Sequence, residues 1–161
     1  MASENRAPQG LEDKVIKVRR CAAVVKGGRR FSFNALVVVG DRQGRVGYGY
    51  GKANEVPPAV EKAVKDASRS LHKISLKGDT IPHRIVGKYG STSVVLVPAG
   101  PGTGVKAGPG VREVLELCGV RNVLTKAHGS TNALNLVKAT MAGLKQLRTK
   151  EQVEALRGIT L

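Results

Sequence analysis

The residues best suited to chemistry form a short basic segment, Lys26-Gly27-Gly28-Arg29-Arg30. Two adjacent glycines let the backbone lie flat against a sugar-phosphate chain, and the three flanking cations can neutralise phosphates. Between Lys14 and Lys52 there are ten basic residues and a single acidic one, Asp41. The cations nearest the segment are Lys17, Arg19, Arg20, Arg42, Arg45 and Lys52. This pattern predicts a turn at residues 26–30 that binds RNA or DNA.

The whole chain shares this basic character. Of its 161 residues, 27 are Lys or Arg and 12 are Asp or Glu, so the formal net charge is +15 and the pI is near 10.4. Such a charge attracts nucleic acid, an anionic membrane or an acidic protein. A membrane surface favours a basic amphipathic helix, whereas here the basic residues are densest where strands and turns are expected. Folded RNA is favoured over DNA because no base-reading helix is apparent.

Residues typical of catalysis or metal binding are scattered along the chain. Gly47–Lys52 looks superficially like a phosphate loop, but Val46 and Ala53 stand where that motif needs Gly and Ser or Thr. The isolated candidates for ligands or nucleophiles are His72, His83, His128, Cys21 and Cys118. No apolar run suggests a membrane span or a signal peptide. We therefore expect a cytoplasmic protein that is not an enzyme and has no metal or cofactor.

A second segment of interest is the loop Gly100–Gly110, which holds five glycines in eleven residues and one charge, Lys106. It can be a plain connection, a surface that docks against another protein, or a phosphate cradle before a short helix. The cradle lacks a carboxylate for a metal, since Glu113 and Glu116 are expected to be solvated. The enzyme alternative predicts nucleotide binding at this loop and loss of turnover in a Lys106→Ala variant.

The first half of the chain reads as three strands and a helix. The strands are expected at Lys14–Val25, Phe31–Gly40 and Arg45–Lys52. In the second strand one face carries Phe31, Phe33, Ala35, Val37 and Val39. In the third, Gly47, Gly49 and Gly51 leave one face bare for a helix, and Tyr48 and Tyr50 on the other face are expected in the core. The helix begins near Val56, and its apolar positions are Val60, Ala63, Val64, Ala67, Leu71 and Ile74.

The second half alternates strands and helices. Strands are expected at Ile81–Tyr89, Thr92–Val97 and Val120–Thr125, and helices at Val111–Cys118 and after Asn132. Thr149 and Gln152 form a capping-box pattern for a last short helix that ends near Gly158. We expect an α+β chain divided into a disordered extension (1–12), a β-β-β-α domain (13–77), an α/β domain (78–148) and a helical tail (149–161).

Several of these motifs are recognisable. The strings KGGRRFSF at 26–33 and VVVGD at 37–41 resemble the bacterial small-subunit ribosomal protein five family. Further matching segments are Gly44–Gly47, Gly51–Ala53, Glu55–Pro57, Gly102–Val105, Ala107-Gly108, Val114–Glu116, Gly119-Val120 and Gly129–Asn132. The resemblance covers roughly residues 12–158. Departures from the enteric form are Arg30 in place of a hydrophobic residue, Gly100-Pro101 before Gly102, and Lys106 in place of an apolar residue.

The resemblance implies a fold and a function. The first domain would be similar to a double-stranded-RNA-binding fold without its first helix. The second would be a βαβ-type sandwich with a left-handed crossover, shared in outline with certain small-molecule kinases but without their activity. The protein would be a structural constituent of the small ribosomal subunit. It would bind 16S ribosomal RNA and support subunit assembly, head–body geometry and translational accuracy.

The resemblance also assigns residues. Lys26, Gly27, Gly28 and Arg29 would contact 16S RNA near the spectinomycin site. With the cations noted above, the expected RNA-binding set is Lys17, Arg19, Arg20, Lys26, Gly27, Gly28, Arg29, Arg30, Arg45 and Lys52. Ribosomal protein four would meet Gly102, Thr103, Gly104 and Arg112, and ribosomal protein eight would meet Val153, Leu156 and Arg157. A free-standing RNA chaperone that binds any duplex RNA remains an alternative.

Overall fold

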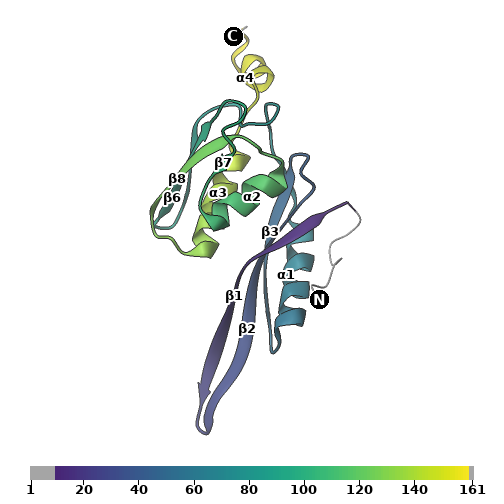
Figure 1. The fold of residues 1–161 in the computed structure, drawn as a ribbon, viewed down its shortest axis with the longest axis vertical. Coiled ribbons are helices and arrows are strands. Elements are labelled where there is room, and N and C mark those ends of the chain that lie inside the picture. Colours follow the sequence, from purple (N-terminus) through teal and green to yellow (C-terminus); the bar gives the residue numbers. More distant parts are fainter. Residues whose placement is uncertain (1–9, 160–161) are drawn as a thin grey trace.

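A computed structural model describes residues 10–159 of the chain, which form four layers (Figure 1). Helix α1 (Val56–Arg69) covers one face of a sheet made of β1 (Glu12–Val25), β2 (Gly28–Gly40), β3 (Arg45–Ala53) and β4 (His72–Lys73). Helices α2 (Pro109–Cys118) and α3 (Ala133–Lys145) lie between this sheet and a second one. The predicted α+β class, with a β-β-β-α part followed by a mixed sheet and helices, is confirmed.

The second sheet has the strand order β5-β6-β8-β7. Its strands are β5 (Ile85–Tyr89), β6 (Thr92–Pro98), β7 (Val105–Lys106) and β8 (Val123–Gly129). Strands β7 and β8 are parallel and are joined through α2, so they form a βαβ unit. The handedness of this crossover stays a prediction. A last helix, α4 (Lys150–Arg157), begins with the predicted capping box between Thr149 and Gln152.

Helix α1 lies against β3 backbone to backbone, as the glycine alternation predicted. A Cβ atom placed on Gly49 would lie 2.0 Å from the carbonyl oxygen of Ala63, and one on Gly51 would lie 2.1 Å from that of Ala59. Only glycine permits this approach. The core beneath α1 consists of Ala35, Val37, Val39, Ala59, Ala63, Val64 and Ala67.

Several boundaries differ from the sequence-based expectation, and three of the differences have a clear structural cause. Helix α1 ends at Arg69 rather than continuing to Ile74, because the chain turns at Ser70 and pairs with β3 through β4. Strand β5 starts at Ile85 rather than Ile81, although Ile81 is fully buried in the core. Strand β8 starts at Val123 rather than Val120, because the backbone N–H groups of residues 121 and 122 donate to the carbonyl of Asp79.

One apolar core is shared by both sheets. Leu36, Val38 and Val46, on the face of the first sheet opposite α1, belong to the same buried cluster as residues of α2, α3, β6 and β8. The turn between β2 and β3 also closes the end of α2, since the N–H groups of Arg42 and Gly44 donate to the last carbonyls of that helix. The two halves of the molecule are therefore coupled directly.

An ion-pair cluster strengthens this junction. The Lys14 ammonium on β1 lies 2.7 Å from a carboxylate oxygen of Glu113 and 2.9 Å from one of Glu116, both on α2. Hydrogen bonds from Lys14 to Glu113 and then Glu116 raise the pKa of the lysine. These two glutamates were expected to be solvated, and the structure corrects that expectation because they are bound to β1. The proposed division of the chain near residue 78 remains a prediction.

The expected disordered extension covers residues 1–12, of which 1–9 lie outside the described residues. Within the described part of that stretch, Leu11 packs against the core beneath α1, and Glu12 begins β1 and pairs with Arg42 at 2.7 Å. None of the helices in residues 10–159 has the length and apolar character needed to cross a bilayer. In the same residues, no three His, Cys, Asp or Glu side chains gather as a metal-binding group.

The two cysteines should differ sharply in reactivity. Cys118 is fully buried, and burial, followed by the charge of Asp41, raises the pKa of its thiol to about 12. Cys21 is only half-buried. Since the thiolate is the reactive form, a disulfide reagent at pH 8 should modify one thiol rapidly in the folded protein and the second only after denaturation. The fast phase should vanish in a Cys21→Ser variant. Two equally fast thiols in the folded chain would contradict the burial of Cys118.

Candidate nucleic-acid interface

Strands β1 and β2 extend beyond the rest of the molecule as a two-stranded arm, defined here as residues 18–31 (Figure 1). Every residue of the arm is exposed except Cys21, which is half-buried. The turn at its tip is two residues long, Lys26-Gly27, and Gly28 follows with a φ of 140°. The predicted turn at 26–30 is therefore shorter than expected, because Arg29 and Arg30 already belong to β2.

The strand register distributes the arm's cations over both of its faces. A β-bulge between Val15 and Lys17 shifts β1 by one residue, after which Lys17, Arg19 and Arg30 share the face that looks toward α3. Arg20 and Arg29 lie on the opposite face, the one that α1 covers further along the sheet. Because both faces are basic and solvated, the arm can contact phosphates on two sides at once.

A basic cleft lies where the arm joins the body. One row of residues across β1, β2 and β3 consists of Arg19, Asn34 and Lys52. In the neighbouring row, Leu36 lies between Lys17 and Tyr50. The cleft has a volume of about 90 Å³, and its lining is Lys17, Arg19, Asn34, Leu36, Tyr50, Asn132, Ala133 and Leu134. The last three residues start α3, and the positive end of that helix adds to the attraction for anions.

Tyr50 corrects a prediction. It was expected in the core with Tyr48, but its side chain is 46% exposed and lines this cleft. Tyr48 packs against the shared core as expected. The two differ because the helices pack directly on the first half of β3, whereas Tyr50 lies further along the strand and is separated from the start of α3 by the cleft. Tyr50 and Asn34 are the residues of the interface that sequence reasoning missed, and only the position of α3 reveals them.

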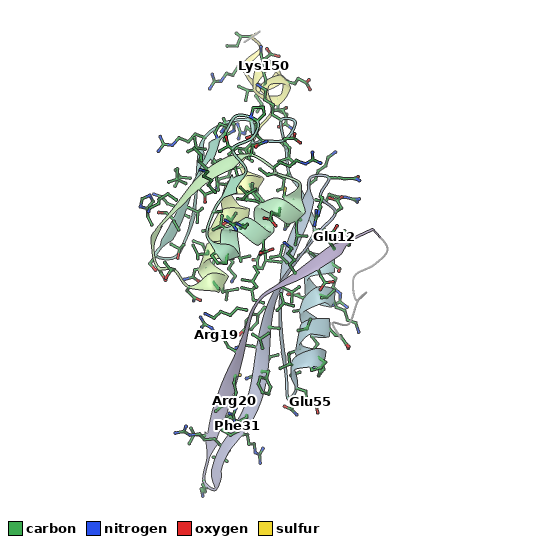
Figure 2. The ribbon with its side chains drawn as sticks, viewed as in Figure 1. Glu12, Arg19, Arg20, Phe31, Glu55 and Lys150 are labelled. Atoms are coloured by element: carbon green, nitrogen blue, oxygen red, sulfur yellow. The ribbon has the colours of Figure 1, made fainter. Side chains whose placement is uncertain are left out.

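On the opposite face, Arg20 stacks on Phe31. The guanidinium carbon of Arg20 lies 3.4 Å from the centre of the Phe31 ring, and Phe31 is 47% exposed (Figure 2). Both side chains lie on the diagonal of one strand pair, where such contacts form. The stack holds the Arg20 charge in a fixed direction on the arm.

Arg45 does not join the arm. It begins β3 at the end of the sheet nearest α2, and its Nε lies 2.7 Å from Oδ2 of Asp41. Burial alone would raise the pKa of Asp41, but hydrogen bonds from Arg45 and from the Gln43 backbone outweigh it and hold the pKa below its usual value. Arg45 thus stabilises the turn between β2 and β3, and its contact with RNA stays a prediction at a position separate from the arm.

Hydrogen bonds anchor the loop Gly102-Thr103-Gly104 at the edge of the second sheet. Gly102 and Gly104 adopt positive φ angles of 86° and 74°, and the Thr103 hydroxyl donates to the carbonyl of Gly100 at 2.8 Å. The N–H of Gly104 donates to Oδ1 of Asn122, a side chain that is 8% exposed. Arg112 is exposed in the first turn of α2, on the element that follows β7.

Helix α4 carries the third group of predicted contact residues. Val153 is half-buried, Leu156 is 69% exposed and Arg157 is exposed, and all three line an open groove together with His83 and Lys145. The helix and the arm lie at opposite ends of the molecule's long axis (Figure 1). The predicted contact residues therefore form three separate surfaces rather than one site.

The side chains on these three surfaces are suited to binding rather than to catalysis. The arm and cleft offer cations, amide groups and two exposed aromatic rings, which together suit phosphates and bases. For the enzyme alternative at the Gly100–Gly110 loop, the two carboxylates that could assist a metal are those of Glu113 and Glu116. Both are engaged by Lys14 on the other sheet.

Comparisons with known proteins agree over nearly the whole chain. The family model described as "Ribosomal protein S5, N-terminal domain" matches residues 11–75, and the corresponding C-terminal domain matches residues 87–157. A relative from Rhodopirellula baltica, named "Small ribosomal subunit protein uS5", is 59% identical over 93% of this chain and 85% of its own. Proteins of the same name from Rubrobacter xylanophilus and Psychromonas ingrahamii are 56% and 50% identical, over 92% and 100% of this chain and 74% and 96% of their own.

Proposed function

The chain belongs to the ribosomal protein S5 family, and from this membership we propose how its three surfaces divide their contacts within the small ribosomal subunit. As a member it is a structural protein of that subunit, located in the cytoplasm, and it binds ribosomal RNA and other ribosomal proteins. It is not an enzyme. The recognition made from the sequence motifs is confirmed by these matches.

We assign 16S RNA to the arm and the cleft at its base. The observation that carries this assignment is the exposed arm itself, which has Lys26 at its tip and cations on both faces. A bare two-stranded ribbon gains little from its own packing, so its length and charge are best explained by an anionic partner. The proposed RNA-binding residues are Lys17, Arg19, Arg20, Lys26, Gly27, Gly28, Arg29, Arg30, Arg45 and Lys52, with Asn34 and Tyr50 added.

A Gly28→Asp variant tests the tip. Gly28 has a φ of 140°, a conformation that side chains rarely adopt, and open space surrounds its Cα. Aspartate would strain the turn and place an anion beside the phosphates, so we expect the footprint of the tip on 16S RNA to weaken while the body still folds. The measurement is chemical probing of small subunits rebuilt with the variant. An unchanged footprint would exclude the tip from the interface.

We assign ribosomal protein four to Gly102, Thr103, Gly104 and Arg112. The loop is fixed by Asn122 and by its own hydroxyl bond, so it presents a constant shape to a neighbouring protein. The exposed Leu156, with Val153 and Arg157, makes α4 a short amphipathic helix suited to ribosomal protein eight. Translational accuracy would follow from how easily the first of these contacts opens when the subunit closes on a cognate tRNA.

Salt-dependent fractionation of a cell lysate tests the structural assignment as a whole. A structural protein should sediment with the small subunit and leave it only in high salt or denaturant. A free RNA chaperone would be found mainly off the ribosome and would bind duplex RNA of any sequence. That second result would overturn the assignment.

A further inference from the structure

The second sheet has one face that no helix covers. Helices α2 and α3 pack on its inner face, where a Cβ on Gly87 of β5 would lie 2.0 Å from the carbonyl oxygen of Ala139 in α3. The outer face looks away from both helices and from the first sheet (Figure 1). It lies apart from the arm and from α4.

The strand register shows which residues form this outer face. One row across β5, β6 and β8 consists of Val86, Val95 and Lys126. The row two positions along the strands consists of Lys88, Ser93 and His128. On the other side of the first row, Val97, Leu124 and Lys106 align across β6, β8 and β7. We call these nine residues the open face.

The open face combines an apolar centre with a positive rim. Val86 is 38% exposed and Leu124 is 40% exposed, while Val95 and Val97 between them are half-buried. Lys88, Lys106 and Lys126 are exposed, and none of the ion pairs formed within residues 10–159 involves them. Strands β5 to β8 contain no acidic residue. The charge on this face is therefore uncompensated within the described chain.

We propose that the open face is a docking surface for a protein whose complementary patch has acidic residues around an apolar centre. The valines and the leucine gain free energy only against other apolar groups, and three unpaired lysines select against a basic partner. RNA fits this face less well, because its centre is aliphatic and the one ring among its nine residues, the imidazole of His128, stands in an outer row. Tyr89, the nearby aromatic, is turned toward α3, where Lys138 donates to its hydroxyl at 3.0 Å. This surface goes beyond the three contacts proposed above.

Photo-crosslinking in assembled small subunits tests the proposal. The full chain, with p-benzoylphenylalanine in place of Leu124, is incorporated into small subunits, and the subunits are irradiated. The crosslinked product is then treated with nuclease and protease and identified by mass spectrometry. We expect a crosslink to a peptide of another ribosomal protein that carries Asp or Glu beside apolar residues. A Lys126→Glu substitution should lower its yield at least about tenfold, whereas Lys65→Glu, an equal charge change on exposed α1, should leave it unchanged.

A crosslink to RNA, or to a basic peptide, or a yield that responds equally to both charge changes, would overturn the proposal. A second measurement covers a variant that enters subunits poorly. Leu124→Cys in a Cys21→Ser background should react with a maleimide in the free chain and be protected in the subunit. Equal reactivity in both would show that nothing covers the open face.

Discussion

A Gly49→Ala variant is expected to be strongly destabilised, because α1 can no longer lie against β3. The added Cβ would lie 2.0 Å from the Ala63 carbonyl oxygen and 2.5 Å from the Ala67 backbone nitrogen. Both contacts are with the backbone of α1, so no side chain can rotate away to relieve them. The helix must move outward, and the buried contacts of Ala63, Val64 and Ala67 beneath it are lost together.

The expected cost is about 3 kcal/mol or more, since overpacking a tight core costs roughly 1–3 kcal/mol and here the obstacle is rigid. Urea denaturation of the purified chain measures it. Gly27→Ala is the matched control, because open space surrounds position 27 and its φ is not positive. A Gly49→Ala variant as stable as this control would mean that α1 does not lie on the glycine face of β3.

The sequence revealed this packing because the alternation of glycine with larger residues along β3 is a local property. Gly47, Gly49 and Gly51 share one face of a strand whatever surrounds them, and the helix that follows has small residues at the matching spacing. The capping box at Thr149 was equally local, and it formed as predicted. Where a feature depends on neighbours in sequence alone, composition and spacing were enough.

The sequence could not show where along a strand the packing of helices over it ends. Tyr50 occupies the same strand face as Val46, yet Val46 is fully buried and Tyr50 is 46% exposed. Helices from the second half of the chain cover the first position and not the last. Arg45 was grouped with the arm by proximity in sequence, whereas it is turned to Asp41 at the other end of β3.

The bulge at Ile16 had a similar effect on the candidate site. It changes which face the cations of β1 occupy, and so it places Lys17 and Arg19 above the cleft and Arg20 beside Phe31. Without the bulge, these assignments would be exchanged. Nothing in the residue types near position 16 marks such an irregularity, so the basic character of the arm could be predicted and its arrangement on two faces could not.

Removing the three charges at the tip of the arm should weaken binding to 16S RNA far more than the fraction of the total positive charge that they represent. Lys26, Arg29 and Arg30 are all exposed around the tip, where the body of the protein screens none of them. If each contacts a phosphate worth about 1 kcal/mol, the triple change to glutamine lowers affinity on the order of a hundredfold at physiological salt. The slope of log affinity against log salt should fall by roughly one for each contact removed.

The measurement is titration of a 16S RNA fragment at several salt concentrations, and a matched variant separates position from charge. Lys62, Lys65 and Arg69 lie exposed on α1, away from the arm tip, and their change to glutamine removes the same three charges. We expect this control to lose only the small, long-range part of the attraction, because charges beyond a Debye length of about 8 Å are screened. Equal losses in the two variants would mean that net charge, and not the arm, carries RNA binding. A large loss confined to the arm variant, with a reduced salt slope, would establish the tip as a direct phosphate contact.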